Sequence, residues 1–313
     1  MKTIKKILMV VVLTIGSLSI HAQQAPMYTH YMNNTLVINP AYAGSRDALT
    51  VTSINRMQWV GFEGAPITNT LTMHMPLRNK HVGLGLSIMN DKIGPSNNTS
   101  VYVDYAYIMN LTENSKLALG LSAGANLIQT DLNSLQLDNP DDPAFQQDIK
   151  NHVTPDVGFG VYYSRERFYA GISVPNLFQN SYSVVNQDNE NTVIGREQRH
   201  YFFIAGALFN ISEDLAFKPT TFVKLTPGAP IQADLTGSFI IMKRLLFGAM
   251  IRTGDAVGGL IGLDITDQLH VGYSYDWSYG LQTGLYNKGS HELVLRYDFI
   301  SFGKKQIHSP RNF

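Results

Sequence analysis

From about Ala48 onward, apolar residues recur at every second position along most of the chain. The clearest segment places Leu117, Leu119 and Leu121 on one face, with Gly120 and Ser122 on the other. Alternation with a period of two residues is typical of a β-strand whose two faces meet different surroundings. We therefore predict an all-β fold in which small and polar residues share one face of the strands.

Segments of this kind recur about fourteen times, an even number as expected of a single-chain bacterial outer-membrane barrel. The predicted strands are 48–59, 66–76, 81–91, 98–111, 115–131, 153–164, 167–174, 199–210, 213–224, 230–242, 244–253, 256–265, 267–276 and 289–301. We predict that residues 48–301 form a transmembrane antiparallel β-barrel in the outer membrane.

The connections between the predicted strands sort by length. The even-numbered ones are short, whereas the three longest, 132–152, 175–198 and 277–288, are all odd-numbered. Outer-membrane barrels combine short periplasmic turns with longer outer loops. A soluble β-sandwich also suits short strands, but it gives no reason for this alternation. The pattern places both termini on the periplasmic side.

Charged residues of the predicted strands fall mainly on the polar face, where they would point into the lumen. They are Asp104, Asp156, Lys218, Lys224, Asp234, Arg252, Asp264, Glu292, Arg296 and Asp298. A basic side chain facing lipid at mid-membrane would cost about 2–4 kcal/mol. Glycines on the same face, such as Gly83 and Gly160, are expected to relieve crowding inside the barrel.

The first residues predict export to the outer membrane. Lys2, Lys5 and Lys6 precede an apolar stretch over 7–20, and Ala22 ends a small-residue cleavage site, so we predict a signal peptide over 1–22. A retained membrane anchor is the alternative, although the apolar stretch is shorter than the roughly 20 residues of a spanning helix.

Residues 23–47 are too aromatic for a solvated tail. Tyr28, Tyr31 and Tyr42, with the Asn39-Pro40 pair between them, require a surface to bury against, and the periplasmic mouth of the barrel is the nearest. We predict a plug or lining segment, with a partner-binding arm as the alternative. Residues 302–313 are predicted to form a periplasmic C-terminal tail.

The amino-acid composition excludes several kinds of functional site. The chain has no cysteine, which excludes disulfides, thiolate metal sites and cysteine nucleophiles. Its 24 basic residues balance 24 acidic ones, so nucleic acid is not an expected partner.

No enzyme active site is predicted. His270 and Ser274 share one face of a strand, but residues four apart there lie too far from each other for a hydrogen bond. The nine histidines lack the spacing of a helical zinc site. The acidic stretch 138–143 could hold calcium, although it lacks the spacing and glycine of an EF-hand, and a solvated outer loop is the preferred interpretation. We expect no cofactor.

Several motifs along the mature chain also resemble the PorP/SprF family of type IX secretion-system outer-membrane proteins. They include NPAYAGSR at 39–46, QWVGFEGAP at 58–66, NDKIGP at 90–95, RTGDA at 252–256 and SPR at 309–311. The resemblance implies a partner protein for type IX cargo, often an adhesin with a type B C-terminal signal domain. Such a protein supports secretion or cell-surface anchoring of the cargo, and with it gliding and adhesion.

Three groups of residues are candidates for contacts. The expected cargo contacts, in outer turns, are Phe62, Glu63, Lys92, Ile93 and Pro95. The plug residues that could also touch periplasmic secretion machinery are Tyr28, Tyr31, Asn39, Pro40 and Tyr42, and those of the tail are Ser309, Pro310 and Arg311. Outer-membrane lipid would surround the wall. The alternative function is a transport pore for small solutes or fatty acids.

Overall fold

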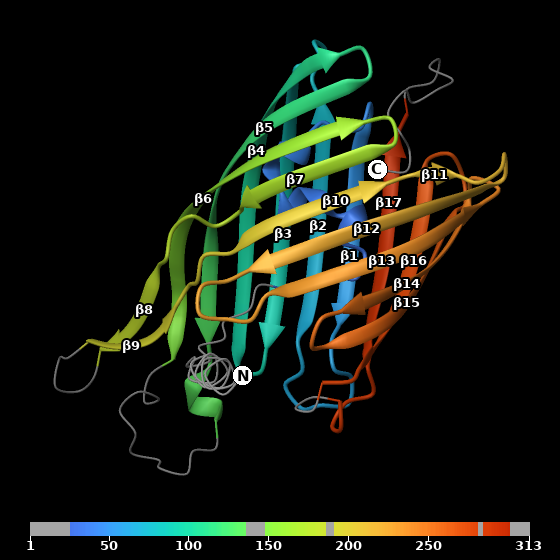
Figure 1. Cartoon of the computed structure of the whole chain (residues 1–313). Coiled ribbons are helices and arrows are strands. Elements are labelled where there is room, and N and C mark those ends of the chain that lie inside the picture. The colour runs from blue at the N-terminus through green and yellow to red at the C-terminus, as the bar shows by residue number, and fades with distance from the viewer. Residues whose placement is uncertain (1–25, 136–147, 186–190, 281–283, 301–313) are drawn as a thin grey trace, which may run out of the picture.

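One antiparallel sheet closes on itself to form a barrel in the computed structural model (Figure 1), which describes residues 26–135, 148–185, 191–280 and 284–300. The wall strands are β1 (Leu49–Met57), β2 (Ile67–Pro76), β3 (Val82–Ile93), β4 (Ser96–Thr112), β5 (Ser115–Thr130), β6 (Ile149–Arg165), β7 (Phe168–Val174), β10 (Tyr201–Ala207), β12 (Leu215–Leu225), β13 (Gln232–Ile241), β14 (Leu245–Arg252), β15 (Ala256–Asp264), β16 (Leu269–Ser278) and β17 (Ser290–Phe299).

Neighbouring wall strands follow one another along the chain, and the first pairs with the last. Leu49 of β1 lies opposite Phe299 of β17, and the pairing continues to Met57 and His291. The predicted barrel of fourteen strands is confirmed. The largest boundary difference is in β6, which begins at Ile149 rather than at residue 153.

The two ends of the barrel differ as the loop lengths predict. The connections 131–148, 175–200 and 279–289 leave the wall at one end, the lower end in Figure 1, together with the loop 58–66. We call this the long-loop end. The opposite, short-turn end carries the turns between β2 and β3, β4 and β5, β6 and β7, β10 and β12, β13 and β14, and β15 and β16.

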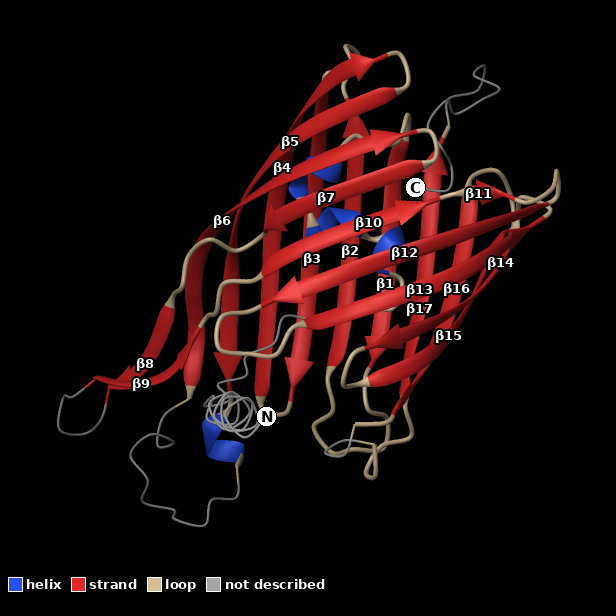
Figure 2. Ribbon diagram, viewed as in Figure 1, coloured by secondary structure: helices blue, strands red, loops and turns tan. Residues whose placement is uncertain are grey.

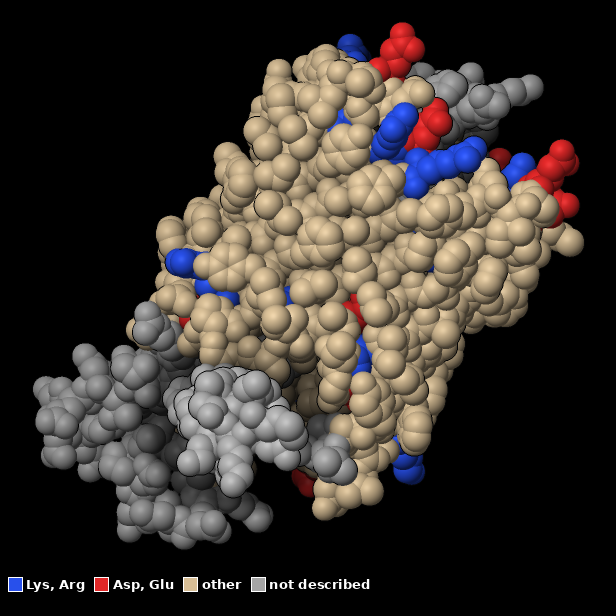
Figure 3. All heavy atoms as spheres, viewed as in Figure 1, with Lys and Arg blue, Asp and Glu red and all other residues tan. Residues whose placement is uncertain are grey.

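The outer face of the wall is apolar. Val103, Leu121 and Leu235 project outward with more than half of their surface exposed. In the space-filling view most of this face lacks charge, and many of the charged atoms gather along its upper edge, at the short-turn end (Figure 3). Such a face suits the hydrocarbon core of a bilayer.

The inner face holds the predicted lumen charges. Nine of the ten are buried, and Asp264 is half-buried. Glycine on this face allows close approach, since a Cβ at Gly83 would overlap the backbone carbonyl of Ala43. The packing role predicted for glycine is therefore supported at Gly83.

Three short helices lie inside the barrel (Figure 2). They are η1 (Tyr31–Asn33), α2 (Thr35–Ile38) and η2 (Pro40–Tyr42), all upstream of β1. Their apolar side chains join those of β1, β4, β7, β10, β12 and β17 in one buried cluster, so the core of the molecule is the lumen. Within the described ranges, no helix is long and apolar enough to cross a membrane.

The long connections carry structure that the sequence pattern did not predict. β8 (Ser181–Val185) and β9 (Asn191–Arg196) form a two-stranded hairpin separate from the wall. η3 (Leu132–Ser134) follows β5. At the short-turn end, the two-residue β11 (Phe209–Asn210), which falls within the predicted strand 199–210, extends the pairing of β12 beyond β10. The acidic stretch 138–143, the predicted signal peptide and the predicted tail lie outside the described residues.

Candidate functional site

The segment 26–47, which we call the plug, fills most of the lumen. Tyr28, Tyr31, Asn39, Pro40 and Tyr42 are all buried within it. Burial raises the pKa of the Tyr28 and Tyr31 hydroxyls above the ordinary value, so both groups stay neutral and act as hydrogen-bonding groups.

A buried ionic cluster fastens the plug near the long-loop end. Glu292 accepts hydrogen bonds from the backbone amides of Thr29 and His30, at 2.9 and 2.7 Å. Arg56 lies 3.0 Å from Glu292 and 2.8 Å from Asp276. Asp276 also accepts a 2.6 Å hydrogen bond from the Thr29 hydroxyl. Charge-assisted bonds of this kind are strong, and here they tie the plug backbone to β1, β16 and β17.

A second ion pair lies beside the first. Arg252 Nε donates to Asp234 Oδ1 at 2.9 Å, and Nη2 donates to Oδ2 at 2.7 Å, which is a two-pronged contact. The same Nη2 reaches the Tyr28 carbonyl oxygen at 3.4 Å. Farther along the plug, the Tyr31 hydroxyl lies 2.9 Å from that of Thr220. The plug therefore also contacts β12, β13 and β14.

The middle of the plug is held by Asn39. Its side chain accepts a hydrogen bond from the backbone amide of Ala41, which caps η2. Its Nδ2 donates to the carbonyls of Val161 and Ile172, at 3.0 and 3.2 Å. Pro40 follows at the first position of η2, where a backbone N–H would have no helical partner. The Asn39-Pro40 pair thus shapes the plug and joins it to β6 and β7.

Another ion pair fastens the plug at the short-turn end. Arg46 Nη2 lies 2.9 Å from Asp298 Oδ2, and both side chains are almost fully buried. Just before it, the Tyr42 ring packs edge-on against the rings of His74 and Tyr162, at 5.2 and 5.4 Å between centroids. Because Glu292 and Asp298 lie near opposite ends of β17, the plug runs along the lumen.

This path corrects one expectation from the sequence. The plug does not cover the periplasmic mouth alone, because its partners lie from one end of the wall strands to the other. Arg56 was not among the predicted lumen charges, although it lies on the same face of β1 as Thr50 and Thr52. That register was the signal in the sequence that could have revealed it.

The predicted cargo contacts come together at the long-loop end. Three backbone hydrogen bonds join the loops after β1, β3, β5 and β16: Val60 N to Gly289 O at 2.8 Å, Gly94 N to Gly64 O at 2.9 Å, and Asp131 N to Pro95 O at 3.1 Å. We call these connected loops, together with Lys92 and Ile93 at the adjoining end of β3, the rim. The rim contains all five of the predicted contact residues.

Apolar side chains stand exposed on the rim. Phe62, in the loop after β1, and Ile93, the last residue of β3, expose 53% and 45% of their surface. Glu63 and Lys92 beside them are exposed, and Pro95 is half-buried. The long loop 277–288 was expected to help present the cargo site, but Leu285 and Tyr286 within it, which are 80% and 67% exposed, were not singled out. Their apolar character within a long loop was the available signal.

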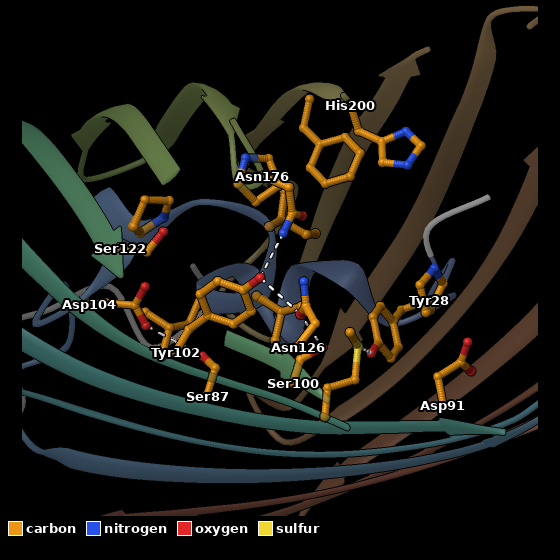
Figure 4. Close-up of a pocket in the computed structure, with 18 of the residues that line it drawn as sticks. Tyr28, Ser87, Asp91, Ser100, Tyr102, Asp104, Ser122, Asn126, Asn176 and His200 are labelled. Carbon is orange, nitrogen blue, oxygen red and sulfur yellow. Dashed lines mark hydrogen bonds between the residues drawn. The ribbon is translucent and has the colours of Figure 1, made fainter. Parts of the chain in front are cut away.

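Among the cavities that the plug leaves, one of about 210 Å³ lies beside strands β3, β4 and β5 (Figure 4). Leu36, Val37 and Ile38 of α2 form an apolar side. The facing wall is polar and includes Tyr102 and Asp104. The cavity was not predicted from the sequence.

The described residues that were considered for catalysis do not come together as a site. His270 Nδ1 lies 2.7 Å from Asp264, but Ser274 is four residues farther along the same strand, about 13 Å away. Among the described residues, no three histidine or carboxylate side chains come close enough to share a metal ion.

Three solved structures are similar to this chain over most of its length. Omp33 of Acinetobacter baumannii is 11% identical, with 82% of this chain and 100% of that chain covered and a TM-score of 0.47. The CymD monoaromatic hydrocarbon channel is 10% identical, with 87% and 93% covered and a TM-score of 0.49. A Pseudomonas aeruginosa FadL homologue is 10% identical, with 85% and 94% covered and a TM-score of 0.46. No curated protein matches the sequence.

A comparison with models of known protein families shows to which family the chain belongs. The model of the type IX secretion system membrane protein PorP/SprF matches residues 20–297, which is most of the chain and includes the plug and almost the whole barrel. The resemblance found in the motifs is confirmed. This outer-membrane β-barrel belongs to the PorP/SprF family and is associated with type IX secretion.

Proposed function

We propose that the protein supports secretion or cell-surface anchoring of a type IX cargo adhesin, and that it binds the cargo through the rim. The observation that carries the proposal is the combination of exposed apolar side chains on the rim with a lumen filled by the plug. The protein would act by contact with another protein rather than by conducting a solute.

The proposal places the long-loop end outside the cell, as in outer-membrane barrels generally. Phe62 and Leu285 would then be exposed to the exterior, where solvent does not favour large apolar groups. Apolar patches with a polar border often mark protein-binding surfaces, and a few large anchors carry most of the binding energy of an interface. Glu63 and Lys92 would supply the polar border.

The other partners follow from the same orientation. The resemblance implies a cargo with a type B C-terminal signal domain. Tyr28, Tyr31 and Tyr42 are buried in the lumen, so a contact with periplasmic machinery would be made by the short-turn end or by the predicted tail with Ser309, Pro310 and Arg311. Gliding and adhesion would depend on the protein through its cargo.

The alternative is a transport pore for small solutes or fatty acids. Such a pore needs a continuous path past the plug. The hydrogen bonds from the Thr29 and His30 amides to Glu292 near one end and the Arg46–Asp298 pair at the other hold the plug in the lumen. This arrangement favours the contact function.

The test compares substitutions at the two ends of the barrel. Phe62→Ser combined with Leu285→Ser should lower the amount of cargo on the cell surface by at least about tenfold, since each lost anchor costs on the order of 1–2 kcal/mol. Surface cargo would be measured by antibody binding to intact cells, and barrel abundance by immunoblotting of outer membranes.

The matched control is Phe209→Ser combined with Ile211→Ser at the short-turn end, where the two side chains are 57% and 58% exposed. This variant should display the cargo normally. Normal display by the rim variant at equal barrel abundance would reject the rim as the cargo site. In a strain that lacks the barrel, loss of solute uptake with normal cargo display would favour the pore.

A further inference from the structure

The cavity beside the plug extends toward the long-loop end. Asp91 and Asn98, at the ends of β3 and β4 nearest that end, are only half-buried. Asp104 and Ser122 lie deeper along β4 and β5 and are almost fully buried. A ligand entering from the long-loop end would therefore pass Asp91 before it reaches Asp104.

Three carboxylates line the cavity, and none of them has a cationic partner among the described residues. Asp91 accepts a 2.6 Å hydrogen bond from Thr68, and Glu197 accepts one of 2.8 Å from Asn180. Asp104 is 3% exposed, and Ser87 donates to it over a long 3.4 Å. Within the described ranges, none of the three forms a salt bridge. The neighbouring lumen carboxylate Asp234, by contrast, pairs with an arginine.

The lining residues supply no compensating positive charge. They include neither lysine nor arginine, and the basic side chain among them is His200. Burial lowers the pKa of His200 to about 4, so the ring is neutral at pH 7. A buried carboxylate without a cationic partner is costly. In Figure 4 the side chain of Asp104 points into the cavity. The cavity therefore lacks a positive group to compensate these carboxylates, and a bound ligand could provide one.

A metal ion is a poor match for this arrangement. In the part of the chain that the structure describes, no three carboxylate or histidine groups converge on one point. The opposite side of the cavity is also apolar, formed by Leu36, Ile38 and Phe222. A ligand that satisfies both sides combines a positive charge with a hydrocarbon body.

We propose that this cavity binds an organic cation, an ammonium or guanidinium group on an apolar body, with Asp104 as its principal counter-charge and Asp91 nearer the entrance. Two sources offer this chemistry: a free alkylamine, and a lysine or arginine side chain within an apolar peptide. The proposal does not depend on cargo binding at the rim, because the cavity lies inside the lumen and shares no residue with Phe62 or Leu285.

The test uses the purified full-length barrel in detergent and isothermal titration calorimetry. The probes are n-hexylamine, which is cationic at pH 7, n-hexanol, which is neutral, and hexanoate, which is anionic. We expect hexylamine to bind at least about tenfold more tightly than either analogue, as hydrogen bonds between charged groups predict. A short apolar peptide with one lysine distinguishes the sources: tighter binding of the peptide than of hexylamine indicates a side chain, and the reverse indicates a free amine.

Asp104→Asn should weaken hexylamine binding by about tenfold or more, and Asp91→Asn by less. Glu166→Gln, at an exposed position in the turn between β6 and β7, removes one negative charge at the far end and should bind normally. Equal binding of hexylamine and hexanol, no binding of hexylamine, or full affinity in Asp104→Asn would overturn the proposal. If Asp104→Asn does not fold, Asp91→Asn replaces it in the test: weakened hexylamine binding would support the proposal, and unchanged binding would overturn it.

Discussion

Glycine at the inner face of the wall determines how closely the plug backbone approaches. A Cβ at Gly120 of β5 would overlap backbone atoms of Pro40 and Ala41 in the plug. Alanine at this position can be accommodated only by a shift of η2 away from the wall. The contact therefore couples one residue of the barrel to the position of the whole plug.

We predict that Gly120→Ala destabilises the protein by about 1–3 kcal/mol, the usual cost of overpacking a filled core. The measurement is the free energy of unfolding in urea. Gly259→Ala is the matched control, because a Cβ on Gly259 would meet no atom within 4 Å. Equal unfolding free energies for the two variants would contradict the close packing described for the plug.

The lumen charges show what can and cannot be predicted at the scale of residues. The alternation with a period of two residues correctly predicted that Asp234, Arg252 and Glu292 face inward. It could not predict that Glu292 pairs with Arg56, 236 positions away in the chain. That choice depends on the closure of the sheet between β1 and β17 and on the depth of Thr29 in the lumen.

At the scale of elements, the plug and the wall are separate structural units. The wall strands hydrogen-bond to one another in a closed ring, whereas the plug adds three short helices of three or four residues each. Several lumen charges would keep their partners without the plug, since Arg56 would still face Asp276 and Arg252 would still face Asp234. The wall should therefore assemble in the absence of the plug.

Deletion of residues 26–45 should leave a folded barrel with an open lumen. We expect a stable ionic conductance in planar lipid bilayers, where the intact protein should conduct little, because the buried plug side chains would be replaced by water. Circular dichroism should show that the β-structure is retained. A folded deletion variant that does not conduct would show that the wall itself closes the lumen.

The elements also differ in how well the sequence predicted them. Wall strands such as β5 were predicted because lipid on one side and the lumen on the other impose alternation. The β8–β9 hairpin lies beyond the wall, where nothing imposes that pattern, and it was missed. The aromatic residues of the plug predicted burial, but burial alone does not specify depth, so its path along the lumen was not foreseen.

At the scale of the whole molecule, the two ends of the barrel carry different surfaces. The long-loop end carries the rim with exposed Phe62 and the entrance to the cavity beside Asp91. The short-turn end carries compact turns and the Arg46–Asp298 pair. The cargo proposal therefore depends on which end faces the exterior, and the orientation also sets the compartment from which a cation would reach the cavity.

Cysteine labelling tests the orientation directly, because the chain contains no cysteine and any introduced thiol is unique. Glu63→Cys on the rim and Glu166→Cys in a short turn exchange the same residue type at exposed positions of opposite ends. In intact cells a membrane-impermeant maleimide should label Glu63→Cys, and it should label Glu166→Cys only after the outer membrane is permeabilised. The reverse pattern would place the rim in the periplasm and would exclude it as the site that displays cargo, whereas the cavity would still be open to a periplasmic cation.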